Sequence, residues 1–173
     1  MPSGAVVTQT LPLSALYVLE MSGIAPADTV LEIAPADARL IMMRHGQPDN
    51  TEFAILRFPA KVFTPPPGRD SVRISVRARP GVYGVELTTD APFGNGAKIV
   101  FKYPIHFSAP VGARQAYGSL VRLERALSVA QLQPDGRYAL LVSTRPASDN
   151  LEAPLSGPGI YLVVAPRELP QER

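Results

Sequence analysis

The chain has 173 residues, of which 46% are hydrophobic and 18% charged, so it is long enough for one well-buried core and is not a disordered polypeptide. Seventeen basic and fifteen acidic residues leave a formal charge of only +2, which argues against nucleic-acid binding, because that function needs a large basic excess. The absence of cysteine excludes disulfides, thiolate nucleophiles and thiolate metal sites.

The N-terminal part of the chain is apolar and contains no Lys or Arg before Arg39. Residues 5–10 and 13–20 are predicted as two strands separated by Pro12, and the apolar segment 5–19 is equally consistent with an arm that docks on a partner. A third strand is expected at 29–33, flanked by similar turns, because Ile-Ala-Pro-Ala-Asp occurs at both 24–28 and 33–37.

Targeting signals are not expected in this chain. No run of eighteen apolar residues predicts a transmembrane helix. A signal peptide needs a basic start before its apolar segment, which is missing here. We therefore expect either a cytoplasmic protein or one whose targeting segment has been removed.

The next predicted strands are 39–44 and 52–58, joined by a polar loop at 45–50. The stretch Thr64-Pro65-Pro66-Pro67-Gly68 follows. Three successive prolines favour the polyproline II conformation, which suits either a ligand for an aromatic groove or a stiff link between sheets. We interpret it as the link, and it is also the best candidate for a domain boundary within an otherwise single domain, 1–173.

Alternation of apolar and polar residues is clearest between Ser71 and Phe107. Val72, Ile74 and Val76 alternate with Arg73, Ser75 and Arg77, and Ile99, Phe101 and Tyr103 alternate with Lys98, Val100 and Lys102. Such alternation predicts strands with one buried and one solvated face. Pro80-Gly81 and Asn95-Gly96 are predicted turns, the latter in a hairpin.

Residues 111–133 form the longest segment without proline and the one serious helix candidate. Leu120, Leu123 and Leu127 have helical spacing, but Val121 and Val129 would then lie on the polar side. The turn signal Gln133-Pro134-Asp135-Gly136 favours a hairpin between strands at 126–132 and 137–142. We therefore predict strands, with a last buried strand at 159–164.

These elements amount to about ten short strands with little or no helix, which predicts an antiparallel all-β sandwich or barrel. Two stretches share a pattern of glycine, aliphatic residue and tyrosine in succession: Pro80-Gly81-Val82-Tyr83 and Gly159-Ile160-Tyr161-Leu162. With this texture the chain resembles the immunoglobulin-like sandwiches of bacterial envelope proteins. The resemblance implies a β-sandwich with a binding or scaffolding role.

A possible catalytic motif is Leu40-Ile41-Met42-Met43-Arg44-His45-Gly46, which resembles the start of the histidine phosphatase superfamily. The resemblance implies that His45 is a phosphorylated nucleophile and Arg44 a phosphate clamp. That family also implies an α/β fold and a second histidine followed by glycine, whereas His106 precedes Phe107.

Alternatively, His45 and His106 share a metal with Met42 or Met43, since imidazole and thioether ligands suit copper. Two histidines without a supporting ligand pattern favour ordinary structural roles. The sequence therefore predicts no catalytic, metal or cofactor residue.

A possible binding face is basic. Arg73 and Arg77 point to one side of their strand, and Lys98 and Lys102 point outward from another. If those strands are neighbours, the four residues form a cationic face suited to acidic proteins, anionic glycans or lipid headgroups. The alternatives are a solvated sheet face or an edge kept charged against aggregation.

Together these features predict a non-enzymatic structural or interaction module, an accessory subunit of a larger membrane-associated or cell-envelope assembly. A periplasmic or envelope location at the membrane periphery is favoured over the cytoplasm. The alternative is a glycan- or lipid-binding sandwich that uses the basic face and tyrosines such as Tyr83, Tyr103 and Tyr117.

Overall fold

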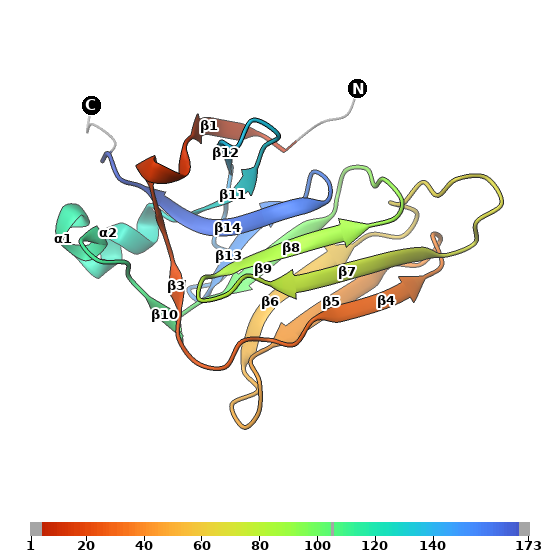
Figure 1. Ribbon diagram of the computed structural model, residues 1–173, viewed down its shortest axis with the longest axis horizontal. Coiled ribbons are helices and arrows are strands. Elements are labelled where there is room, and N and C mark those ends of the chain that lie inside the picture. Colours follow the sequence, from red (N-terminus) through yellow and green to blue (C-terminus); the bar gives the residue numbers. More distant parts are fainter. Residues whose placement is uncertain (1–4, 105, 170–173) are drawn as a thin grey trace.

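The computed structural model describes residues 5–104 and 106–169, which fold into two packed layers of antiparallel β-sheet (Figure 1). Strands make up 45% of the structure and helices 9%. The predicted all-β class is therefore confirmed. Every strand pairing among the described residues is antiparallel.

The larger sheet forms one layer. In spatial order it contains β1 (Val7–Leu11), β12 (Tyr138–Leu141), β11 (Ser128–Leu132), β14 (Gly159–Pro166), β8 (Gly84–Thr89), β7 (Val72–Ala78) and β4 (Thr29–Ile33), and β2 (Leu16–Val18) also pairs with β14.

The smaller sheet forms the other layer, in the order β13 (Asn150–Pro154), β9 (Lys98–Lys102), β6 (Glu52–Phe58) and β5 (Arg39–Arg44). A separate pair is made by β3 (Glu20–Met21) and β10 (Phe107–Ser108). The edge strands β4 and β5 belong to different sheets but lie along the same side of the molecule (Figure 1).

The main core fills the space between the sheets. On β7 the side chains of Val72, Ile74 and Val76 are fully buried, and on β9 those of Ile99 and Phe101 are as well. The alternation in the sequence therefore marks the inward faces of these two strands correctly. Core residues come from both sides of the proline link at 64–68, which carries the chain from β6 in the smaller sheet to β7 in the larger one.

The apolar N-terminal segment lies within the larger sheet. β1 pairs with β12, and β2 pairs with β14. A second, smaller apolar cluster forms there, on the face of the larger sheet that points away from the main core. Its buried members are Leu16, Ala130, Tyr138, Leu140, Leu162 and Val164. Of the two interpretations of residues 5–19, the one as strands of the sandwich is confirmed, but the strand predicted at 13–20 is wrong in its limits, because a 3-10 helix occupies Leu13–Ala15 and β2 covers only Leu16–Val18.

The structure corrects the prediction of strands throughout residues 111–133. Two short helices, α1 (Ala113–Tyr117) and α2 (Leu120–Arg125), precede β11, and a 3-10 helix at Leu13–Ala15 lies between β1 and β2. Ser119 caps α2, because its side chain accepts a hydrogen bond from the backbone N–H of Arg122 at 3.2 Å. The predicted hairpin that follows is confirmed, since β11 pairs with β12 around the turn at 133–136.

Two other local predictions differ from the structure. The Asn95-Gly96 turn is not part of a hairpin, because β8 and β9 belong to different sheets and the turn lies on the crossing between them. Strand β13 was not expected from the sequence, because only Leu151 and Ala153 mark its buried side.

Candidate functional site

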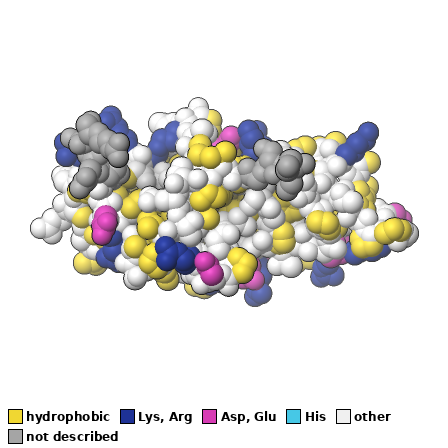
Figure 2. Space-filling view, turned by 90° about the horizontal axis from the view of Figure 1, so that it is seen from above, with side chains coloured by type: hydrophobic (Ala, Val, Ile, Leu, Met, Phe, Trp, Pro, Cys, Tyr) yellow, Lys and Arg dark blue, Asp and Glu magenta, His cyan; other side chains and the backbone are white. Residues whose placement is uncertain are grey.

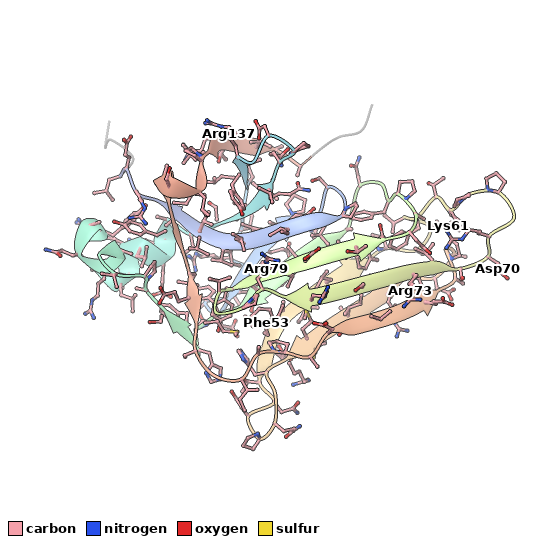
Figure 3. The ribbon with its side chains drawn as sticks, viewed as in Figure 1. Phe53, Lys61, Asp70, Arg73, Arg79 and Arg137 are labelled. Atoms are coloured by element: carbon pink, nitrogen blue, oxygen red, sulfur yellow. The ribbon has the colours of Figure 1, made fainter. Side chains whose placement is uncertain are left out.

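The four residues of the predicted basic face do not come together. Arg73 and Arg77 lie on the outer face of β7 in the larger sheet, where Figure 3 labels Arg73, whereas Lys98 and Lys102 lie on the outer face of β9 in the smaller sheet. β7 pairs with β4 and β8, so the neighbouring strands that the prediction required are absent. The two pairs of cations face opposite sides of the sandwich.

Acidic neighbours also offset three of these four cations. Arg77 lies 3.3 Å from Asp28, and Lys98 lies 3.3 Å from Glu152. Lys102 lies 3.7 Å from Glu52. Figure 2 likewise shows basic and acidic groups scattered over the face that it displays. This pattern is that of solvated sheet faces, where ion pairs contribute little to stability.

The tyrosines considered for glycan binding are internal. The Tyr83 and Tyr103 side chains are completely buried, and Tyr117 is 4% exposed. The Tyr117 hydroxyl donates a hydrogen bond to the backbone carbonyl of Pro166 at 2.6 Å. These rings therefore support the core and offer no exposed platform on which a sugar could stack.

The two histidines, by contrast, are brought into contact. Their ring centroids lie 4.4 Å apart although 61 positions separate His45 from His106 in the sequence. Sheet topology explains this approach: β5 and β9 flank β6 and are both antiparallel to it, so they run in the same direction. The residues that follow β5 and β9 consequently emerge at the same end of the smaller sheet.

Asp49, in the loop between β5 and β6, is the third member of this group. One donor atom from each of His45, Asp49 and His106 lies within 4.8 Å of the others, and His106 Nε2 contacts Asp49 Oδ2. The loop projects from the end of the sandwich (Figure 1), and its base is closed by a hydrogen bond from the His45 N–H to the Thr51 carbonyl, at 2.8 Å. We call these three residues the histidine–aspartate cluster.

Aromatic groups line the inner side of the cluster. A β-bulge between Met43 and Arg44 shifts the register of β5 against β6 and turns Phe53 into the interior, at the place labelled in Figure 3. Phe53 meets the His45 ring edge-on at 5.6 Å and stacks on Tyr83 at 5.3 Å. Burial lowers the pKa of His45 and raises that of the Tyr83 phenol, so both groups are held in their neutral forms at neutral pH.

The Arg-His-Gly motif has local structural roles. The Arg44 guanidinium donates to the Asn50 carbonyl at 3.2 Å and lies 3.8 Å from a Glu52 carboxylate oxygen. At Gly46 a Cβ atom would lie 2.3 Å from the Ile24 side chain, so close packing requires glycine there. The all-β architecture also differs from the α/β fold that the phosphatase resemblance implies.

A second candidate site is β5 itself, which is an edge strand of the smaller sheet. On its outer face Leu40 is 52% exposed and Met42 is 37% exposed. Met42 lies opposite Ile55 on β6, and Ile55 lies opposite Val100 on β9; these two neighbours are buried, so Leu40 and Met42 form the exposed apolar part of this face. We call β5 with these outward side chains the β5 edge.

Comparison of the chain with protein-family models, curated proteins and solved structures found no match. The resemblance to immunoglobulin-like envelope domains therefore stays a prediction from the sequence. Within the described part of the chain, none of the helices combines the length and apolar character needed to cross a membrane.

Proposed function

We propose that this chain is a non-enzymatic interaction module, an accessory subunit of a larger assembly, and that it binds a partner polypeptide along the β5 edge. The observation that carries this proposal is an open strand whose outer face exposes Leu40 and Met42. Open strand edges bind extended segments through backbone hydrogen bonds, while side-chain rows provide specificity.

Charges around the β5 edge define the chemistry of the partner. Arg39 begins the strand, and Arg57 lies directly opposite Leu40 on β6; both side chains are exposed. An extended apolar segment with acidic residues beside it would complement this surface. Pairing with a second copy is disfavoured, because antiparallel β5 strands in central register would bring Arg39 against Arg44.

The other candidate functions draw less support. The hypothesis of a glycan- or lipid-binding sandwich requires a shared cationic face and accessible tyrosines. The basic residues are divided between the two sheets, and the tyrosines are buried. The envelope and membrane-peripheral location stays a prediction from the sequence, as does the non-enzymatic character.

The test compares two variants in the source organism, each followed by mass spectrometry through gentle detergent extraction and size fractionation. Leu40→Glu with Met42→Glu places charge on the β5 edge, and Val121→Glu is the matched control, because Val121 is an exposed apolar residue on α2. We expect the natural chain and the control to migrate in a complex, and the edge variant to migrate at its own chain mass.

Two results would overturn the proposal. If the natural chain migrates alone, it is not a subunit of a larger assembly. If the edge variant stays in the complex, the β5 edge is not the contact with the partner. Circular dichroism of the purified variants shows that loss of the complex does not follow from unfolding.

A further inference from the structure

The histidine–aspartate cluster combines groups that sandwiches of this kind do not need for their core. Apart from the tyrosines, His45 is the one polar or charged residue among the buried residues described, at 2% exposure. It does not pack alone, because His106 approaches it from the segment after β9 and Asp49 from the loop that begins with His45 itself. The cluster thus collects two imidazoles and a carboxylate at the end of the smaller sheet.

The hydrogen bonding of His45 identifies the state of its other ring nitrogen. His45 Nδ1 lies 3.0 Å from the Ile24 carbonyl oxygen, which can only accept, so Nδ1 carries the proton. In the neutral imidazole Nε2 then presents a lone pair. That Nε2 is buried and has no hydrogen-bond partner among the described residues, which is costly unless the lone pair serves another purpose.

This arrangement is the one that metal-ligating histidines commonly adopt. One ring nitrogen donates to a backbone carbonyl and fixes the ring, and the other coordinates the ion. Here the anchoring segment is itself tied to the cluster, because the Gly46 N–H also donates to the Ile24 carbonyl at 3.3 Å. The His45 ring is therefore oriented before any ion binds.

His106 and Asp49 complete the set of donors. The Nδ1 side of the His106 ring lies against Gly23, where an added Cβ would be only 3.2 Å away, and its Nε2 faces Asp49. The side chains of His106 and Asp49 are 21% and 26% exposed, although His106 Nε2 itself is buried, so the route from solvent into the cluster passes the partly exposed Asp49 carboxylate. An ion can thus enter from the surface and meet the buried His45 nitrogen.

We propose that His45, Asp49 and His106 form a binding site for a divalent metal ion of the Zn²⁺ class. Two imidazole nitrogens and one carboxylate oxygen are typical zinc ligands, with bond lengths of about 2.0–2.2 Å. The donor atoms, now within 4.8 Å of one another, need only small side-chain adjustments to close on one ion. Three protein ligands leave a coordination position for water or an external ligand.

The site departs from the copper hypothesis in its third ligand. Met42 points to the outer face of the smaller sheet, where it is 37% exposed, Met43 is buried in the main core, and the carboxylate of Asp49 lies near the two imidazoles. A carboxylate in place of a thioether makes the set harder, which favours Zn²⁺ over Cu⁺.

The test uses the 173-residue chain without a histidine tag, stripped with chelator and titrated with ZnCl₂ by calorimetry. We expect one Zn²⁺ per chain, and at least about tenfold weaker binding for both Asp49→Asn and His106→Ala, since even the partners of metal ligands contribute about 10- to 100-fold. Asp149→Asn is the matched control, because Asp149 is an exposed acid outside the cluster.

Nuclear magnetic resonance gives a second readout, which does not depend on affinity. The chain contains only two histidines, so ¹⁵N spectra of the imidazoles show signals from two rings. One equivalent of Zn²⁺ should shift the Nε2 resonance of both rings. Asp49→Asn is nearly isosteric and keeps the fold available if His106→Ala does not fold. Absence of Zn²⁺ binding, imidazole signals that do not move, or binding unchanged in both variants would each overturn the site.

Discussion

Asp90 makes two charge-assisted interactions that should stabilise the folded chain. It follows β8 and contacts the Arg69 guanidinium through Oδ2, while its Oδ1 accepts a hydrogen bond from the Arg73 N–H at 2.8 Å. These interactions, with Arg69 first, hold the pKa of Asp90 below its ordinary value of 3.8. They join the end of β8 to the start of β7.

This contact should be visible in the pH dependence of stability. Since the pKa of Asp90 is lower in the folded than in the unfolded chain, the stabilisation is complete above the unfolded pKa and is lost as pH falls through the folded one. We expect Asp90→Asn to lower the melting temperature at neutral pH, and the difference from the natural chain to close below about pH 4.

Asp70→Asn is the control, because Asp70 is exposed near the same end of β7 (Figure 3) and should leave the melting temperature unchanged. Melting curves between pH 2.5 and 8 supply the measurement, taken at steps of about half a pH unit. A difference between Asp90→Asn and the natural chain that stays constant with pH would contradict this account.

At the scale of residues, the sequence indicated two of the three members of the histidine–aspartate cluster. His45 and His106 attract attention because they are the only two histidines, and a shared metal was among the alternatives. Asp49 carried no signal, because an acid in a polar loop is ordinary. The pairing of β5 and β9 with the same strand, β6, decides which loops meet, and side-chain patterns do not encode that order.

At the scale of elements, the least expected feature is the pair of helices α1 and α2. α2 buries Leu123 in the main core and places Glu124 3.1 Å from the buried Tyr103 hydroxyl. Five and six residues are too few to establish a period of 3.6, so the apolar pattern could not distinguish them from strands. Ser119 directly before the helix was the usable signal.

The cap should contribute measurably to stability. Ser119→Ala removes the acceptor for the Arg122 N–H at the start of α2, and we expect it to cost about 1 kcal/mol of unfolding free energy. Urea denaturation measures this, with Ser75→Ala as the control, because Ser75 lies on the outer face of β7 away from any helix. Equal stability of the two variants would show that the cap does not hold α2.

The strands were the most predictable elements. The limits expected for residues 29–33, 39–44 and 52–58 coincide with β4, β5 and β6. Short apolar runs bounded by turn residues mark these strands, although β6 buries four residues in succession, 53–56, and does not alternate. β13 was missed although its burial alternates, because only Leu151 and Ala153 are apolar on its buried side. The pattern also cannot tell that β8 and β9 lie in different sheets.

At the scale of the whole molecule, the question is whether the chain unfolds as one unit. Leu56 on β6 and Ile74 on β7 are both fully buried in the main core, yet they lie on opposite sides of the proline link at 64–68. If this link separated two domains, each side would keep its own core and its own transition. A shared core couples them instead, because losing either layer exposes the inner face of the other.

We therefore expect Leu56→Ala and Ile74→Ala each to lower the same single unfolding transition, by about 2–5 kcal/mol. For a chain of this length that corresponds to a melting temperature lower by several degrees. Val30→Ala is the matched control, since Val30 is 52% exposed on β4 and its truncation leaves no cavity. If calorimetry resolved two transitions, each sensitive to one of the core variants, the proline link would be a domain boundary. A single transition that is sensitive to both variants makes the sandwich one cooperative unit. The same core then holds the β5 edge and the histidine–aspartate cluster in place.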